Sequence, residues 1–158
     1  MIIDLISFSF QRGNLSNANY IIDVRFLNNP FYVDELRDST GLDSEVIKYF
    51  KKDKKTKKFL KELYKWIEYI LKANKNSNKE KIIIAIGCTG GQHRSPYVIE
   101  TLSNHIVKKK LVSEISIYHH ELRKYSKPIK FRNSSLRGAL ATKQSHHRIN
   151  ARRLLRQG

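Results

Sequence analysis

Hydrophobic residues gather in runs along this chain that predict four β-strands. Residues 82–86 form an unbroken apolar run rich in β-branched side chains, as expected of a strand buried on both faces. Residues 1–10 and 20–26 are dense in β-branched and aromatic residues, and residues 111–118 predict a last strand. Turn residues separate the first two runs, so we expect them to be distinct strands.

Apolar residues recur at helical spacing in two further segments. Between residues 59 and 71 they fall on one face with lysines opposite, which predicts an amphipathic helix. Trp66 lies on that apolar face and is expected in the core. Ser95 can cap a second helix, and Pro96 suits its first position. This helix is expected to end in the lysines of residues 108–110, since cations interact favourably with a helix C-terminus.

The alternation of strands and helices predicts an α/β fold, with a small, largely parallel, Rossmann-like sheet flanked by helices. Ligands in such sheets bind beyond the carboxyl ends of the strands. This rule places residues 23–30, 88–95 and 118–120 at one edge of the sheet. Side chains alternate between the two faces of a strand, so one of His119 and His120 is expected to be exposed.

The most informative stretch is residues 88–95, with the sequence Cys-Thr-Gly-Gly-Gln-His-Arg-Ser, which we call the glycine loop. It lies between the buried strand and the second helix. The two glycines allow a tight turn that brings backbone N–H groups towards a ligand, and the helix N-terminus adds partial positive charge. A phosphate, a carboxylate or a nucleic-acid backbone is the expected occupant. The alternative is that the glycines only turn a strand into a helix.

Several residues at this sheet edge are candidates for binding the anion. The candidates are Arg25, Thr89, Gly90, Gly91, His93, Arg94, Ser95 and His119. Arg25 is equally compatible with a structural ion pair to Asp23. The chain has no Cys/His quartet at metal-ligand spacing, so neither a metal site nor a cofactor is expected.

A length of 158 residues indicates one domain, which we place at residues 1–128. A single cysteine excludes an internal disulfide framework, and no run approaches the ~20 apolar residues needed to span a bilayer. Residues 1–6 lack the basic region and cleavage site of a signal peptide. We therefore expect a soluble, cytoplasmic protein without a membrane partner. Residues 129–158 contain no Asp or Glu and no sustained apolar stripe, which predicts a disordered basic tail.

The net charge of +17 is distributed unevenly along the chain. It is −4 over residues 1–45, +8 over 46–80, +5 over 81–127 and +8 over 128–158. A polyanion such as RNA is attracted to such a surface, with an affinity that falls steeply as salt rises. The alternative for the lysine cluster at residues 51–65 is the solvent-facing side of a helix in a lysine-rich protein.

A set of short motifs resembles one known family. The motifs are Asp23-Val24-Arg25-Phe26-Leu27, Asn29-Pro30, Glu35-Leu36-Arg37, Thr40-Gly41-Leu42-Asp43 and the run from Ala85 to Ser95. Together they resemble the C-terminal domain of RapZ, the bacterial RNase adapter protein, in the order and spacing of that family. The resemblance covers about residues 5–128.

This resemblance implies a domain that binds small regulatory RNA, presents it to an endoribonuclease and senses glucosamine-6-phosphate at the glycine loop. It implies that Thr89, Gly90, His93 and Arg94 hold the sugar phosphate, and that a basic end binds RNA. The candidate RNA-binding residues are Lys108, Lys109, Lys110, Arg123, Lys124 and Lys127. A homo-oligomer is compatible with this interpretation.

The sequence departs from the family pattern at several points. Nothing matches the Walker A pattern Gly-x4-Gly-Lys-Ser/Thr of the family's N-terminal domain, so no ATPase or GTPase activity is implied. Phe31 stands where the family has a histidine, which removes one expected polar contact. Asn17 and Asn19 replace acidic residues before the second strand.

The glycine loop also supports an enzymatic alternative. Cys88 and Arg94 have the Cys-x5-Arg spacing of cysteine-dependent phosphatases, in which a thiolate near a helix N-terminus attacks phosphorus. Asp23, Asp43 and Asp53 are candidates for the acid that protonates the leaving group. A third interpretation is a truncated, folded remnant without regulated function.

Overall fold

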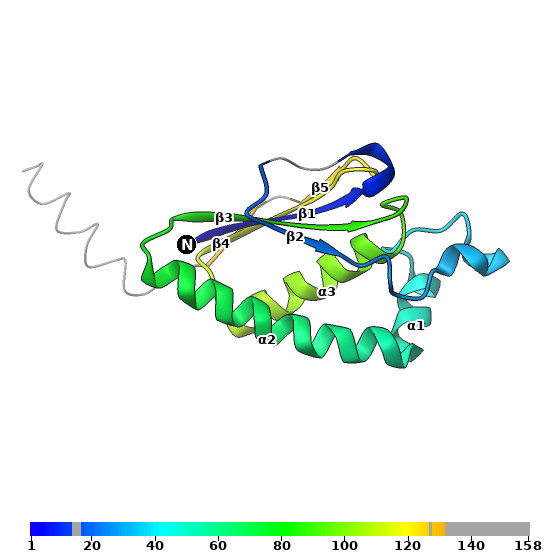
Figure 1. Ribbon diagram of the computed structural model, residues 1–158, viewed down its shortest axis with the longest axis horizontal. Helices are drawn as coiled ribbons and strands as arrows, with labels where there is room; N and C mark the ends of the chain where they lie inside the picture. Colours follow the sequence, from blue (N-terminus) through cyan, green and yellow to red (C-terminus); the bar gives the residue numbers. More distant parts are fainter. Residues whose placement is uncertain (14–16, 127, 132–158) are drawn as a thin grey trace, which may run out of the picture.

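The computed structural model describes residues 1–13, 17–126 and 128–131. These residues form one six-stranded sheet (Figure 1). The strands are β1 (Ile2–Ser9), β2 (Tyr20–Asp23), β3 (Lys81–Cys88), β4 (Glu114–His119), β5 (Lys124–Tyr125) and β6 (Ile129–Lys130). Their order is β2-β3-β1-β4-β5, with β6 also paired to β4. The first four strands are parallel, whereas β5 and β6 run antiparallel to β4. The predicted α/β fold with a largely parallel sheet is confirmed.

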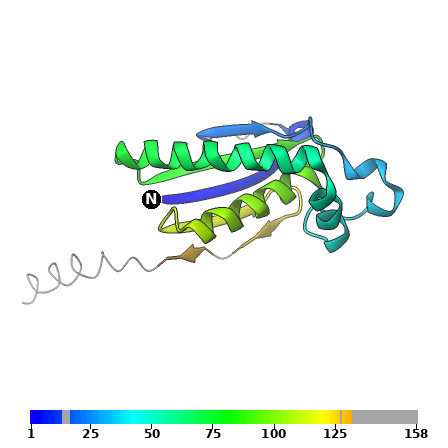
Figure 2. The same ribbon diagram turned by 90° about the horizontal axis from the view of Figure 1, so that it is seen from below.

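Three α-helices of the described residues accompany the sheet. They are α1 (Ser44–Lys52), α2 (Lys54–Asn76) and α3 (Arg94–Lys109), and three short 3₁₀ helices are η1 (Phe10–Arg12), η2 (Pro30–Tyr32) and η3 (Asp34–Leu36). Helices α2 and α3 lie side by side across one face of the sheet (Figure 2). The 3₁₀ helices and α1 gather at the end where the parallel strands finish (Figure 1). No helix in the described ranges is long and apolar enough to cross a bilayer.

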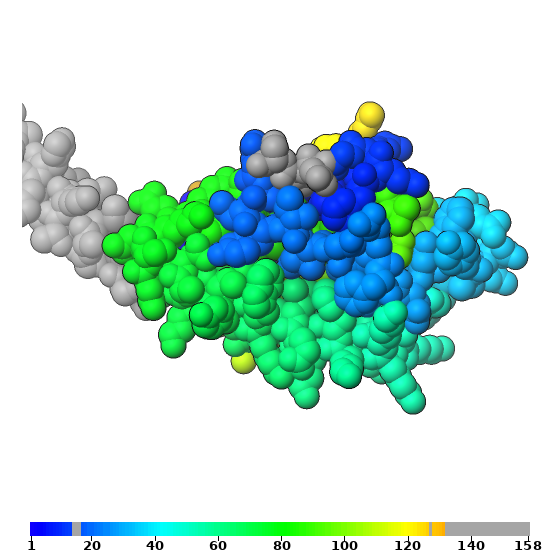
Figure 3. All heavy atoms as spheres, in the orientation of Figure 1, coloured from blue at the N-terminus to red at the C-terminus, as the bar shows by residue number. Residues whose placement is uncertain are grey.

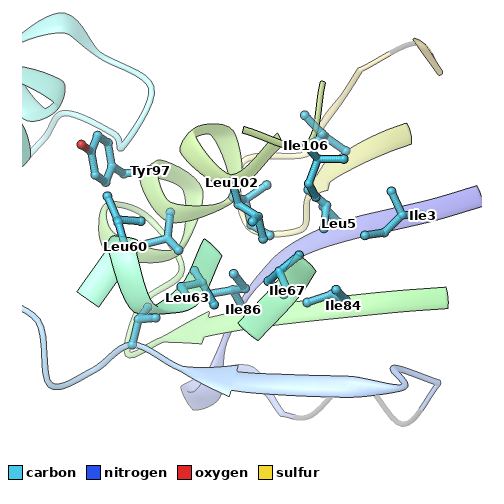
Figure 4. Close-up of a cluster of buried hydrophobic side chains, with 14 of the residues drawn as sticks. Ile3, Leu5, Leu60, Leu63, Ile67, Ile84, Ile86, Tyr97, Leu102 and Ile106 are labelled. Atoms are coloured by element: carbon cyan, nitrogen blue, oxygen red, sulfur yellow. The ribbon is translucent and has the colours of Figure 1, made fainter. Parts of the chain in front are cut away.

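Branched aliphatic side chains from the sheet and the two long helices form the core. On β1 and β3, Ile3, Leu5 and Ile84 point to the helices and are fully buried. Leu63 of α2 and Leu102 of α3 meet them from the other side (Figure 4). Full burial of each such side chain stabilises the fold by roughly 1.5–3 kcal/mol. This packing fixes the helices against the sheet and so fixes the loops between them.

The observed start of α3 differs from the predicted one. The helix begins at Arg94, with His93 as an N-cap that makes no side-chain capping bond. Pro96 therefore occupies the third helical position, which tolerates proline because the first four N–H groups of a helix have no helical partner. Ser95 is buried and its hydroxyl lies 3.2 Å from the sulfur of Cys88, so its side chain links the loop to itself and does not cap the helix.

The end of α3 explains why β4 begins three residues later than predicted. Lys110 has a positive φ of 53°, and its N–H donates to the carbonyl of Val107 at 3.1 Å. The N–H of Leu111 donates to the carbonyl of Ile106 at 3.2 Å. These two bonds form a Schellman motif that closes the helix and delays the strand to Glu114.

Two further expectations differ from the structure. Trp66 is 42% exposed and packs edge-on against Tyr20, so its assignment to the core is wrong. It lies at the margin of the buried stripe of α2. Ile129 and Lys130, which the sequence assigned to the tail, pair with β4. Residues 132–158 of that tail lie outside the described residues.

Candidate functional site

A cavity of about 800 Å³ opens where β1, β2 and β3 end. Figure 1 shows these strand ends at its right. This volume is within the usual range for small-molecule sites. The lining residues are Ser9, Gln11, Arg12, Arg25, Leu27, Asn28, Asn29, Phe31, Tyr32, Cys88, Thr89, Gly90, Gln92, His93 and Arg94. The carboxyl edge of the sheet thus holds the cavity, as the rule for parallel sheets requires.

Arg94 lies at the centre of this arrangement and is only 5% exposed. Its Nη1 donates to the carbonyl oxygens of Arg25 at 2.6 Å and Leu27 at 3.3 Å. Its Nη2 donates to Oγ1 of Thr89 at 3.1 Å, whereas Nε has no partner among the described residues. All these acceptors are neutral, and no carboxylate of the described residues forms an ion pair with Arg94. The positive charge is therefore buried without an ion pair, and only the longer-range charge of Asp23 acts on it, so its burial is costly.

The glycine loop offers backbone donors beside this charge. The N–H groups of residues 90–93 donate no hydrogen bond within the described part of the chain. Gly91 has a positive φ of 67°, and a Cβ at this position would overlap the Glu121 side chain. A Cβ at Gly90 would meet nothing within 4 Å. The loop therefore needs glycine at position 91 for its shape, and its free donors can bind an anion.

Residues 37–41 hold the glycine loop in place through hydrogen bonds to Gln92. Nε2 of Gln92 donates to the carbonyl oxygens of Arg37 at 3.1 Å and Ser39 at 2.7 Å. The N–H of Gly41 donates to the carbonyl of Gln92 at 2.8 Å. A Cβ on Gly41 would overlap the carbonyl oxygen of His93, so only glycine allows this close approach.

Arg25 forms the expected ion pair to Asp23 and also lines the cavity. Its guanidinium makes a forked contact to the Asp23 carboxylate, with distances of 2.7 to 3.0 Å, and it lines the cavity. The side-chain hydrogen bond from Arg25 lowers the pKa of Asp23. The guanidinium also lies 4.4 Å from the ring centroid of Phe10. The pair is half exposed, so Arg25 can reach a ligand in the cavity.

His93 lines the cavity, but one of its ring nitrogens forms a hydrogen bond to the backbone. Its Nε2 lies 2.9 Å from the carbonyl oxygen of Leu36, which can only accept, so Nε2 carries a proton. Burial lowers the pKa of His93 below its ordinary value of 6.5, and the charge of Arg94 lowers it further. His93 is therefore neutral at pH 7.

Three of the candidate anion-binding residues do not line the cavity. Gly91 shapes the loop, and Ser95 is buried against Cys88. His119 is 3% exposed, with Nδ1 2.8 Å from the Ser7 hydroxyl and Nε2 2.9 Å from the Glu100 carboxylate. His120 is exposed, as expected for one of this pair.

The candidate RNA-binding residues lie at two separate places. Arg123 and Lys124 are exposed beside the end of β4, on the cavity side. Hydrogen bonds from Thr40 lower the pKa of Asp43 most, and the nearby charge of Lys124 lowers it further. Residues 108–110 are exposed at the opposite end of α3, whose 16 residues span about 24 Å. Lys127 lies outside the described residues.

The phosphatase interpretation lacks an acid in this geometry. Cys88 is 2% exposed. Hydrogen bonds lower the pKa of Asp23 and Asp43, mainly from Arg25 and Thr40 respectively. Burial opposes the shift at Asp53, but hydrogen bonds to its carboxylate still lower its pKa. All three carboxylates are ionised at neutral pH and poorly suited to donate a proton. Among the described residues no group of His, Cys, Asp and Glu could hold a metal ion.

Sequence reasoning missed the contribution of the end of β1 and of the segment that follows it. Ser9, Gln11 and Arg12 line the cavity. The rule for carboxyl edges, applied to the first strand as well, would have found them. Two of the residues at which the sequence departs from the family pattern lie in different surroundings. Phe31 lines the cavity, whereas Asn19 exchanges hydrogen bonds with the backbone of Ile83.

Comparisons with known proteins converge on one family. A family model described as the RapZ C-terminal domain matches residues 1–123. A nucleotide-binding protein of Lactobacillus acidophilus is 42% identical over 123 residues, which make up 78% of this chain and 41% of that protein. A nucleotide-binding protein of Staphylococcus aureus strain JH9 is 42% identical over 118 residues, or 75% of this chain and 38% of that protein. The chain thus spans about two fifths of the length of these curated relatives.

Substitution at the two glycines of the loop should have unequal effects. We expect Gly91→Ala to lower the free energy of unfolding by about 1–2 kcal/mol, because alanine disfavours a positive φ. Gly90→Ala should change it by less than about 0.5 kcal/mol. Urea unfolding followed by circular dichroism measures both. Equal losses would contradict the assigned loop geometry.

The buried neutral His93 predicts a pH dependence of stability. The unfolded chain binds a proton at this residue near pH 6.5, whereas the folded chain binds it only at lower pH. The stability is therefore complete above pH 6.5 and is lost as the pH falls below it. His93→Gln should show a shallower decrease in unfolding free energy between about pH 7 and 5 than the unmodified protein. Parallel decreases in the two proteins would refute this assignment.

Proposed function

This chain belongs to the RapZ C-terminal domain family, and on that premise we propose that it is an RNA-binding adapter domain whose cavity binds a phosphorylated small molecule. Its motif resemblance to this family is confirmed. The first ligand to test is glucosamine-6-phosphate, which the family resemblance implies. The RNA would be a small regulatory RNA presented to an endoribonuclease.

The observation that carries the ligand proposal is the buried charge of Arg94, which forms no ion pair among the described residues. A phosphate in the cavity would supply the missing anionic partner and accept from the free N–H groups of the glycine loop. Arg25 at the cavity wall would add a second cation. Such charge-assisted hydrogen bonds are about twice as strong as neutral ones.

The rest of the cavity is large enough for more than a phosphate. Its volume of about 800 Å³ leaves room for a sugar, and Gln11, Asn28 and Asn29 offer neutral polar groups to its hydroxyls. Phe31 presents an apolar wall, with the guanidinium of Arg37 5.5 Å from its ring centroid. A nucleoside phosphate is the competing ligand, because the relatives are named as nucleotide-binding proteins.

The RNA proposal rests on charge and its position. The chain carries a net charge of +17, and Arg123 and Lys124 project beside the cavity edge. An RNA held there would lie close to the ligand site. That proximity would let one domain bind both partners, as an adapter must.

Ligand binding is tested by calorimetric titration with glucosamine-6-phosphate, glucose-6-phosphate, a nucleoside monophosphate and inorganic phosphate. We expect Arg94→Lys to weaken sugar-phosphate binding about 10- to 100-fold, because the ammonium cannot reproduce the guanidinium fork. Gly90→Val should also weaken it, since its side chain enters open space at the cavity without disturbing the fold. The matched control is Arg123→Lys, which lies outside the cavity lining and should bind normally. Full binding by the folded Gly90→Val protein would contradict the site.

RNA binding is tested by fluorescence anisotropy with a labelled RNA hairpin carrying a single-stranded 3′ arm. We expect the double variant Arg123→Gln/Lys124→Gln to lower the slope of log affinity against log salt by about 2 units. The control Lys72→Gln/Lys75→Gln removes the same charge from the far end of α2 and should change the slope less. Identical changes in both variants would show generic charge attraction instead of an interface beside the cavity.

A further inference from the structure

Seven exposed lysines crowd the junction of α1 and α2, and we call them the lysine ridge. They are Lys51, Lys52, Lys54, Lys55, Lys57, Lys58 and Lys61. Neither the cavity nor the surface at Arg123 and Lys124 includes any of them. The ridge therefore needs an explanation of its own.

None of the seven ridge lysines forms an ion pair among the described residues. Lys48 pairs with Glu45 at 2.8 Å before the ridge, and Lys65 pairs with Glu62 at 3.1 Å after it. Within the ridge the only acidic residue is Asp53.

The carboxylate of Asp53 is engaged in hydrogen bonds that stabilise the fold. It accepts from the N–H of Thr56 at 3.0 Å and from the Thr56 hydroxyl at 2.5 Å, which caps α2. It also accepts from the side-chain amide of Asn28 at 3.0 Å. No ridge lysine forms an ion pair with it in the described structure. No ion pair within the described residues therefore neutralises the positive charge of the ridge.

Like charges at helical spacing destabilise the helix that carries them. Lys54 and Lys58 are four residues apart, as are Lys57 and Lys61, so these side chains are neighbours on α2. The repulsion lowers stability in the free protein and would be relieved by a bound polyanion. The nearest acidic residues on the two helices, Glu45 and Glu62, form their ion pairs with Lys48 and Lys65 and not with a ridge lysine.

The ridge faces away from the sheet. The apolar residues Leu60, Leu63 and Ile67 of α2 are buried against the sheet and α3, so the lysines occupy the outer side. Figure 3 shows side chains of this helix projecting from the lower surface. A membrane-binding amphipathic helix needs its apolar face for lipid. Here the core occupies that face, which favours a soluble polyanion over a membrane.

The ridge is also continuous with the wall of the cavity. Nζ of Lys55 donates to the carbonyl oxygen of Phe26 at 2.6 Å and lies 5.8 Å from the centroid of its ring. The next two residues, Leu27 and Asn28, line the cavity, and Asn28 bonds to Asp53. Phe26 is 50% exposed, and an exposed aromatic ring among cations is typical of contacts with unpaired bases.

We propose that the lysine ridge binds the phosphodiester backbone of RNA, as a second contact surface distinct from Arg123 and Lys124. This inference rests on the proposed RNA-binding function. Its part on α2, from Lys54 to Lys61, extends about 10 Å along the helix, a length over which one RNA strand presents several phosphates. RNA bound there would pass the cavity rim at Phe26.

The test uses the full chain, the labelled hairpin RNA and salt between about 0.05 and 0.2 M. The ridge variant carries Lys54→Gln, Lys57→Gln, Lys58→Gln and Lys61→Gln. Its control carries Lys72→Gln, Lys75→Gln, Lys79→Gln and Lys130→Gln, which removes the same charge from exposed positions elsewhere. We expect the ridge variant to lose about tenfold or more in affinity and about 3 units of salt slope. The control should lose clearly less.

A melting curve of each variant separates binding from folding. The ridge variant should melt at or above the temperature of the unmodified protein, because repulsion is removed. Equal affinity losses in the ridge and control variants would overturn the proposal. Loss of RNA binding in the Arg123/Lys124 variant with full binding in the ridge variant would overturn the ridge and leave the proposed function standing.

Two other outcomes would overturn the proposal differently. Absence of RNA binding by the unmodified protein would refute both the ridge and the proposed function. Ridge-dependent binding to vesicles of phosphatidylcholine and phosphatidylserine, without ridge-dependent RNA binding, would assign this surface to a membrane instead.

Discussion

The guanidinium group of Arg94 joins two segments that are distant in the sequence. Its hydrogen bonds reach the backbone after β2 through Arg25 and Leu27, and the glycine loop through Thr89. Burial of this charge is tolerable only because neutral dipoles surround it, and it leaves a net positive field inside the cavity. On the proposed function, the same side chain that holds the cavity together would also make it selective for anions.

Charge is organised differently on the outer surface. Inside the cavity one buried arginine acts at short range, where water does not screen it. On the ridge, many exposed lysines act together and are screened by salt. Asn28 connects the two regions, since it lines the cavity and bonds to Asp53 at the start of α2. A small phosphorylated ligand and a long polyanion would therefore meet at one rim.

Local patterns in the sequence were sufficient to predict the strand, glycine loop and helix that build the site. The start of α3 was misplaced because Ser95 looks like a cap, whereas its hydroxyl is used on Cys88. Trp66 was misplaced because a stripe does not show which of its members lies at the margin. The support of the loop by Gln92 and Gly41 was not predicted, since it depends on backbone contacts across more than 50 residues that leave no local pattern.

The central claim is that the glycine loop beside Arg94 is an anion site. The most direct test is a titration of ¹⁵N-labelled protein with glucosamine-6-phosphate and with inorganic phosphate, followed through the backbone amide resonances. The account predicts that the largest shifts fall on residues 90–93, whose N–H groups donate no bond in the described structure. Saturating shifts elsewhere on the domain, with these amides unchanged, would contradict it.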